Sequence, residues 1–218
     1  RYPEFNTSDF MLIERRLPAE AVATIVEIVA KRLPQKFSLD PVRDIQVLSP
    51  MRKGECGVTA LNVALREALN PKGAPIGNSS LCVGDKVMQA RNNYELDVYN
   101  GDTGLITKQI PDAEEIEVDF GDRRVIYPMD ELDNLVPAYA TTVHKSQGSE
   151  YPVVVLALLP QHFMLLQRNL LYTAVTRGKR LVIIVGDPKA LRSAVRNADT
   201  TKRFTHLAGL LRNQPVEG

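Results

Sequence analysis

The sequence predicts an α/β protein in which an open parallel β-sheet is interrupted by a small antiparallel β-barrel. Unbroken apolar runs at 153–159 and 181–186 are typical of strands buried on both faces, and a helical segment follows each of them. A strand followed by a helix between residues 44 and 70 repeats this alternation earlier in the chain. Residues 84–135 instead consist of short β segments separated by turns. Strand–helix alternation on both sides of a β insert indicates a doubly wound sheet with a barrel placed in one connection.

The elements before the insert are a helix, a strand and a second helix. Residues 1–16 contain no obvious first element. A helix is expected to start at Pro18, because proline is tolerated in a first turn, and to stop at Pro34. The strand at 44–50 ends at a proline, and the helix that follows it is expected to end at Asn70-Pro71.

The insert is bounded by changes in composition. Residues 72–80 are rich in Gly, Pro, Asn and Ser and mark a linker. The segments 116–120 and 123–127 predict a hairpin with a tight turn, within a barrel of about five strands. We therefore expect three parts, at 1–83, 84–135 and 136–218.

Three helices are expected after the insert. The first covers 165–176, and the second begins at Asp187-Pro188, where the carboxylate supplies an N-cap. The last is an amphipathic helix at 200–212.

Composition bounds the class of protein. The 218 residues are 44% hydrophobic and 24% charged, as in an ordinary globular protein. No apolar run approaches the roughly 20 residues that span a bilayer, and no signal segment opens the chain, so we expect a cytoplasmic protein that does not enter a membrane. Two cysteines, Cys56 and Cys82, and three histidines make a disulfide framework or a protein-bound metal site improbable.

The net charge of +1 conceals a strong asymmetry. Residues 84–135 contain 5 Lys/Arg and 13 Asp/Glu, a net charge of −8, whereas residues 145–212 contain 11 basic and 3 acidic residues, a net charge of +8. The basic half suits a phosphate polymer. Solvated helix faces explain the same charges equally well.

Residues 141–150 form a polar loop immediately before the buried strand at 153–159. They include hydroxyls, an imidazole, an ammonium, an amide, a glycine and a carboxylate. Such a cluster at the carboxyl end of a strand is where an open parallel sheet usually binds its ligands. The loop is therefore the candidate functional site.

Two motifs and the insert together resemble one helicase family. The segment Ala140-Thr141-Thr142-Val143-His144-Lys145-Ser146-Gln147-Gly148-Ser149-Glu150 resembles the fifth motif of superfamily 1 helicases, and Leu171-Tyr172-Thr173-Ala174-Val175-Thr176-Arg177-Gly178-Lys179-Arg180 resembles their sixth. The insert, with Gly84-Asp85-Lys86-Val87-Met88 and Tyr99-Asn100-Gly101-Asp102-Thr103-Gly104, resembles the SH3-like subdomain of the RecD-like branch. The resemblance extends from about residue 9 to residue 197. It implies a RecA-like sheet with an SH3-like barrel and an ATP-dependent DNA helicase that moves 5′ to 3′ on single-stranded DNA.

The chain departs from this family in one respect. It contains neither the phosphate-binding pattern Gly-x-x-x-x-Gly-Lys-Ser/Thr nor an Asp-Glu pair after an apolar strand to hold magnesium. In the family both belong to the N-terminal motor domain. The chain therefore resembles the second motor domain of a longer polypeptide, with ATP and Mg²⁺ bound mainly by the missing domain. We expect it not to hydrolyse ATP alone.

The resemblance assigns four residues to ATP. Arg177 is expected to be the arginine finger, because its guanidinium is permanently charged and contacts two oxygens at once. Gly148 allows a backbone N–H to approach a phosphate, Glu150 is placed to accept from the ribose, and Gln147 lies beside them. Arg177 also fits a helix-terminal cation, and Glu150 a first-turn carboxylate.

The same loop carries the main DNA candidates. They are donors that position a strand through its backbone without reading its sequence: Thr141, Thr142, His144, Lys145 and Ser146.

Other segments supply weaker DNA candidates. Pro50 and Arg52 follow a parallel strand, Tyr172 and Thr173 precede the arginine finger, and Asn93 lies at a strand end of the insert. Tyr172 fits a core position equally well.

Two further functions fit the sequence. One is a non-catalytic module that docks DNA or protein, and the other is a motor domain of a conjugative relaxase-helicase or an RNA helicase. Recombination or repair proteins are possible partners. Whether the insert guides the strand or docks a protein stays open.

Overall fold

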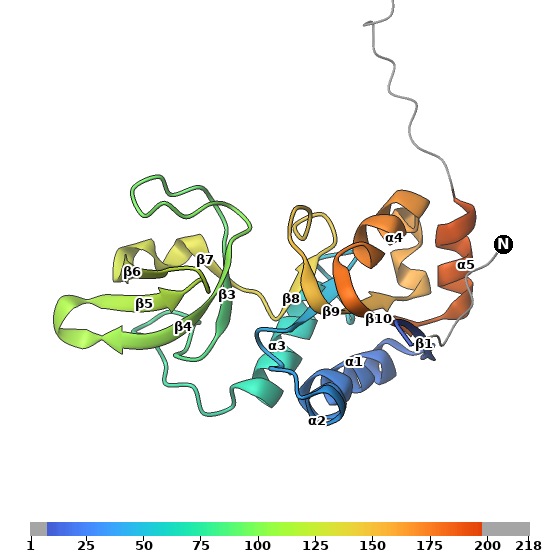
Figure 1. Ribbon diagram of the computed structural model, residues 1–218, viewed down its shortest axis with the longest axis horizontal. Coiled ribbons are helices and arrows are strands. Elements are labelled where there is room, and N and C mark those ends of the chain that lie inside the picture. The colour runs from blue at the N-terminus through green and yellow to red at the C-terminus, as the bar shows by residue number, and fades with distance from the viewer. Residues whose placement is uncertain (1–7, 198–218) are drawn as a thin grey trace, which may run out of the picture.

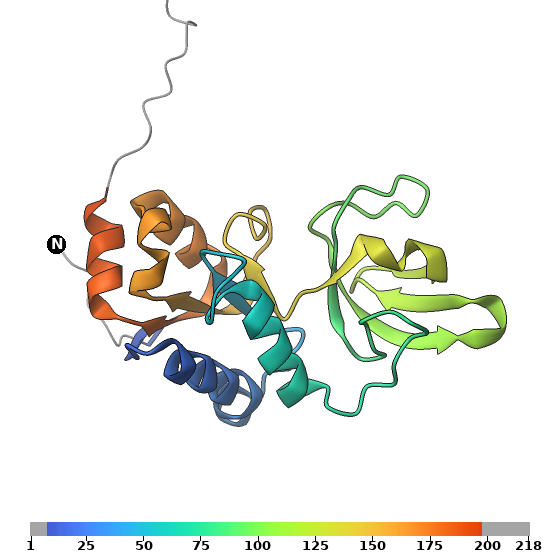
Figure 2. The same ribbon diagram turned by 180° about the vertical axis from the view of Figure 1, so that it is seen from behind.

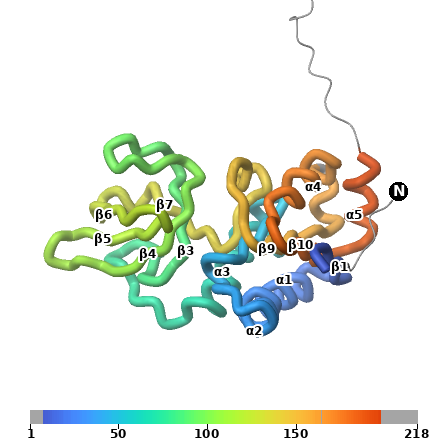
Figure 3. Tube along the Cα trace, viewed as in Figure 1, coloured from blue at the N-terminus to red at the C-terminus, as the bar shows by residue number. Residues whose placement is uncertain are grey.

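The computed structural model describes residues 8–197 and shows two parts side by side, a parallel sheet covered by helices and an antiparallel sheet (Figure 1). The chain leaves the first part after α3 (Val58–Leu69) and returns to it through β7 (Leu135–Pro137) and β8 (Ala140–Thr142), as Figure 3 shows. The expected α/β fold with a β insert is confirmed.

The parallel sheet has the strand order β1-β10-β9-β2-β8, and every neighbouring pair is parallel. Its strands besides β8 are β1 (Phe10–Glu14), β2 (Ile45–Ser49), β9 (Tyr151–Leu158) and β10 (Gly178–Gly186). The two apolar runs of the sequence are β9 and β10, which lie next to each other in the interior of the sheet. Helices cover both faces of these strands, which is why the runs contain no polar alternation.

Alternate residues of β9 enter two separate cores. Val153, Val155 and Ala157 pack beneath α1 (Pro18–Glu27) and α3, whereas Val154 and Leu156 pack beneath α4 (Arg168–Val175) and α5 (Pro188–Arg196). This follows from the two-residue period of a strand. The carboxylate of Asp187 caps α5 by accepting from the Lys189 backbone N–H at 2.7 Å, as expected.

The insert is a five-stranded antiparallel sheet in the order β6-β5-β4-β3-β7. Its strands besides β7 are β3 (Lys86–Gln89), β4 (Thr103–Ile110), β5 (Glu115–Asp119) and β6 (Arg124–Pro128). Short 3₁₀ turns occupy Pro111–Ala113 and Met129–Asn134. Its core already includes Ile76 and Leu81, upstream of the expected boundary at residue 84. The three-part division stays a prediction.

Three expectations about elements differ from the structure. Residues 10–14 form strand β1, which escapes a sequence pattern because it pairs on one side only and is just partly buried. Pro34 does not end its helix, because a π-helical stretch at Ile28–Arg32 places it in the first turn of α2 (Leu33–Phe37), where no N–H is required. The expected helix at 165–176 starts as a 3₁₀ segment, Pro160–Leu165, and becomes α-helical only at Arg168. The expected helix at 200–212 lies outside the described residues.

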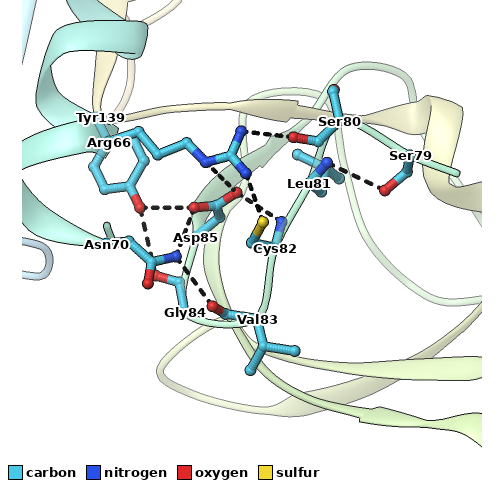
Figure 4. A network of polar contacts seen from close by, with 10 residues as sticks. All are labelled: Arg66, Asn70, Ser79, Ser80, Leu81, Cys82, Val83, Gly84, Asp85 and Tyr139. Carbon is cyan, nitrogen blue, oxygen red and sulfur yellow. Dashed lines mark hydrogen bonds and ion pairs between the residues drawn. The ribbon is translucent and has the colours of Figure 1, made fainter. Parts of the chain in front are cut away.

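A buried carboxylate joins the insert to the parallel-sheet part. Asp85 is fully buried and accepts from the Cys82 backbone N–H at 2.8 Å, Asn70 Nδ2 at 2.8 Å and the Tyr139 hydroxyl at 3.0 Å (Figure 4). Arg66 Nε completes the cluster with an ion pair at 3.3 Å. Arg66 lies in α3, Asn70 caps the end of that helix, and Tyr139 precedes β8. The Asp85 side chain therefore connects three segments that are distant in sequence.

Lys86 and Asp119 of the insert make further contacts near the amino end of β2. Lys86 Nζ donates to the Ile45 carbonyl at 3.2 Å and lies 5.8 Å from the centre of the Tyr151 ring. Burial lowers the pKa of this amine to about 8. Arg43 and Asp119 form an ion pair at 2.7 Å. The insert is therefore fixed to the sheet at several points.

Candidate nucleotide and nucleic-acid site

The polar loop runs from the carboxyl ends of the parallel strands to their amino ends. It leaves β8 at Thr142, which pairs with Ser49 at the carboxyl end of β2, and enters β9 at Tyr151, which pairs with Gly178 at the amino end of β10. The expectation that the whole site lies at the carboxyl ends of strands is thus met by the first half of the loop only. The reason is geometric, because a connection between two parallel strands must return to the end of the sheet at which both strands start.

Arg177 lies beside the second half of the loop. Its Nη1 donates to the Ser149 carbonyl at 2.9 Å, its Nε to the Thr173 carbonyl at 3.2 Å, and its Nη2 to the Thr176 hydroxyl at 3.3 Å. The backbone of Arg177 in turn accepts from the Tyr151 N–H at 2.8 Å. A guanidinium has five N–H donors, so two remain for an outside acceptor. Arg177 and the loop beside Gly148 therefore lie together at the amino ends of β9 and β10.

The backbone conformation at position 148 favours glycine over other residues. Its φ is +89°, and a Cβ built on it meets no atom within 4 Å. A side chain would fit the space but not the left-handed backbone. Gly148, Gln147 and Glu150 are all exposed, so their polar groups are accessible from outside.

Glu150 pairs with a residue that the sequence did not single out. Its carboxylate lies 3.0 Å from Lys179 Nζ, and both side chains are more than half exposed. Lys179 and Ser149, whose carbonyl accepts from Arg177, belong to this cluster although no motif assigned them a role. Neither residue had a spacing or composition signal, because the contacts arise only when β9 and β10 pair.

Four of the expected DNA residues lie along one large groove; Thr141 is buried, and the other three are at least partly exposed. Arg52, Thr142 and Lys145 border a cavity of about 680 Å³ between α3, β8 and the insert. Arg52 and Lys145 are exposed, and neither forms an ion pair with any residue in the described range 8–197. Unpaired cations on a groove are suited to an anionic polymer.

A second, smaller recess collects polar side chains from the loop and α4. His144, Gln147 and Thr173 line a cavity of about 200 Å³ together with Gln167 and Asn169. His144 is exposed and is therefore not part of a hydrophobic core. Tyr172 is 71% exposed, so the core alternative for this tyrosine is also excluded.

Four expected DNA residues have inward-facing roles in the structure. Ser146 is fully buried and its hydroxyl donates to the Val143 carbonyl at 2.8 Å, which stabilises the loop. Thr141 is buried where β8 pairs with β2, and Pro50, which directly follows β2, is buried as well. Asn93 is partly buried and its side-chain oxygen accepts from the backbone N–H groups of Glu95 and Leu96, an Asx-type turn. Sequence alone missed this, because burial of single polar residues depends on neighbours from elsewhere in the chain.

Neither a metal cluster nor a membrane helix is found within residues 8–197. No group of three or more His, Cys, Asp or Glu side chains gathers there in a way that would hold a metal ion. No helix in that range is long and apolar enough to cross a bilayer.

Comparison with known proteins identifies both parts of the chain. The model of the UvrD-like helicase C-terminal domain matches residues 137–185, and that of the ATP-dependent RecD-like DNA helicase SH3 domain matches residues 61–120. The second match begins within α3, upstream of the β strands of the insert.

Individual relatives agree with these matches. The ATP-dependent RecD2 DNA helicase of Deinococcus radiodurans is 38% identical over 152 residues, which cover 69% of this chain and 21% of that protein. The RecBCD enzyme subunit RecD of Mycolicibacterium smegmatis is 33% identical over 186 residues, 82% of this chain and 33% of that protein. The chain thus spans a fifth to a third of the length of these relatives.

A solved structure supports the fold. The Pif1 helicase from Bacteroides in complex with ADP-AlF3 and ssDNA aligns with a TM-score of 0.50 and 16% identity over 88% of this chain and 53% of that chain. The parallel sheet, the two motifs and the inserted barrel define a motor domain of superfamily 1 helicases. The two domain matches and the relatives support a C-terminal fragment of a RecD-like superfamily 1 helicase, with the SH3 domain as its insert.

Proposed function

We propose that this chain is the DNA-binding and arginine-finger half of an ATP-dependent 5′-to-3′ DNA helicase. The observation that carries the proposal is the polar loop itself. It begins at the groove that Thr142 and Lys145 border, and it ends at the amino ends of β9 and β10, where Arg177 donates to the Ser149 carbonyl. One short loop therefore touches both places where a motor needs contacts.

Single-stranded DNA binds along the first half of the loop. Arg52 and Lys145 neutralise backbone phosphates, and the Thr142 hydroxyl and His144 add hydrogen bonds. None of these contacts reads a base edge, so binding is independent of sequence and weakens steeply with salt.

ATP binds at the second half of the loop, with its phosphates and Mg²⁺ held mainly by a P-loop domain that lies outside this sequence. The residues present fit a polyphosphate, because Arg177 has two unused donors and Gly148 exposes its backbone in a conformation that leaves space around it. Arg177 would neutralise charge that develops on the transferred phosphoryl group, and Glu150 would accept from the ribose.

Closure of two motor domains around ATP would pull the Gly148 end of the loop, and the DNA contacts at its Thr142 end would move with it. ATP can drive this change only because it binds the closed form more tightly than the open one. Hydrolysis would release the closed form and leave the strand advanced.

Binding to DNA is tested with the chain by itself. Fluorescence anisotropy with labelled oligo(dT) should show salt-dependent binding, and Lys145→Ala should weaken it. Lys31→Ala is the matched control, because Lys31 is also exposed but lies on the π-helical stretch after α1 and does not line the groove. Equal losses in both variants would contradict a localised site, and no binding would refute the DNA part of the proposal.

The arginine finger is tested in a polypeptide that joins this chain to a P-loop motor domain. Arg177→Ala should lower the ATPase rate by about a thousandfold or more while binding to oligo(dT) persists. Arg180→Ala removes an exposed cation three positions after Arg177, in β10, and should leave the rate nearly unchanged.

If DNA binds but neither variant alters turnover, the chain is a docking module, the alternative function. RNA and DNA strands of both polarities separate the RNA-helicase alternative.

A further inference from the structure

The groove between α3 and the insert has cationic residues at one end and apolar walls along its length. Arg52 and Lys145 border it beside β8. Val63 of α3, which is 57% exposed, and Met88, Val136 and Pro137 of the insert line the walls. Figure 2 shows α3 running from the parallel sheet toward the insert on this side of the molecule.

The charge of the insert determines what it offers to a nucleic acid. With a net charge of −8 between residues 84 and 135, it repels phosphates. The residues that it turns toward the groove, however, are uncharged: Met88, Ala90, Val136 and Pro137. The Arg66 side chain, which also reaches the groove, is neutralised by Asp85, and Glu67 adds a negative charge at the rim. The insert side of the groove therefore suits an apolar, planar group.

We propose that this groove receives an unpaired nucleobase of the single strand, sandwiched between Val63 and the apolar face of the insert, while Arg52 and Lys145 hold the adjoining phosphates. The inference rests on the proposed binding of single-stranded DNA. The volume of about 680 Å³ lies within the range of pockets that enclose small molecules.

The inference gives the insert a definite part in the motor. The acidic insert contributes contacts to bases, and the basic loop contributes contacts to phosphates. Because the Asp85 cluster ties α3 to the insert, the two walls of the groove keep a fixed separation.

The test compares two ligands of equal length and charge, oligo(dT) and an oligomer of abasic sites, bound to the 218-residue chain at one salt concentration. Because the abasic oligomer has no base to fill the groove, the chain should prefer oligo(dT) by about tenfold. Val63→Ser and Val136→Ser, on opposite walls, should each reduce this preference by about threefold or more and leave the affinity for the abasic oligomer unchanged.

Leu17→Ser is the matched control, because Leu17 is 59% exposed and lies before α1, away from the groove. It should keep the full preference, and thermal unfolding should confirm that all three variants are folded. Equal binding of both oligomers by the unmodified chain overturns the base pocket while the proposed DNA binding stands. A preference that survives both wall variants places the base elsewhere and also overturns the inference. Failure to bind either oligomer refutes the proposed function itself.

Discussion

Replacement of Asp85 by alanine should detach the insert from the parallel-sheet part. The Asp85 carboxylate is fully buried and accepts three hydrogen bonds, from the Cys82 N–H, Asn70 Nδ2 and the Tyr139 hydroxyl, besides its ion pair with Arg66. Burial of the ring, and after it the proximity of the Asp85 carboxylate, raise the pKa of Tyr139, so this phenol stays a neutral donor at all ordinary pH values. Alanine removes the one acceptor that all four donors share.

The expected loss can be worked from these contacts. A buried ion pair broken from one side costs about 3–5 kcal/mol, because a charge is left without its partner. The Arg66 side chain remains 30% exposed, so water relieves part of this cost. The Cys82 N–H and the Tyr139 hydroxyl, which is left with a long 3.5 Å contact to the Gly84 carbonyl, add about 1 kcal/mol each, whereas Asn70 Nδ2 keeps its bond to the Val83 carbonyl at 3.0 Å. We expect the free energy of unfolding to fall by about 4 kcal/mol, which for a domain of this size lowers Tm by about 8–16 °C.

Denaturant unfolding followed by circular dichroism measures the loss. Asp112→Ala is the control, because this carboxylate is exposed in a 3₁₀ turn of the same insert. Asp85→Asn keeps the shape and one acceptor oxygen and should fall between the two. In a double-mutant cycle, Asp85→Ala should cost much less once Arg66 is already methionine. A loss below about 1 kcal/mol for Asp85→Ala would show that the cluster does not hold the insert.

Three smaller predictions test other parts of the structure. Burial lowers the pKa of His162 to about 4, below the 6.5 of the unfolded chain, so the unfolded state binds a proton first, and stability should fall by about 3 kcal/mol as pH drops from 6.5 to 4. His162→Gln should flatten that part of the stability curve, and parallel curves would contradict the assignment. Ser146→Ala should cost about 1 kcal/mol through the lost bond to Val143 without changing the affinity for oligo(dT); a weaker affinity in a stable variant would restore Ser146 to the DNA site. Gly148→Ala should cost about 1–2 kcal/mol through its backbone conformation alone, and an unchanged free energy of unfolding would show that φ of +89° is not required.

Sequence by itself determined the features that neighbouring residues control. The apolar runs of β9 and β10 predict strands buried on both faces, and Asp187-Pro188 specifies the start of α5 through a cap and a proline. The motifs around the polar loop and Arg177, read in order with the insert between residues 84 and 135, were sufficient for the family. In each case the signal lies within a few residues of the feature that it predicts.

Only the tertiary structure decided which polar residues face outward and which segments meet. Ser146 and His144 are two positions apart in one loop, yet the first is buried and the second exposed, because burial depends on what packs over each. The pairing of Glu150 with Lys179, the role of Asp85 and the groove beside Val63 all need segments that are distant in the chain. Periodicity and capping operate between neighbours along the backbone, whereas pairing and enclosure are set by contacts across the fold, and these exist only once the sheet and the insert have docked.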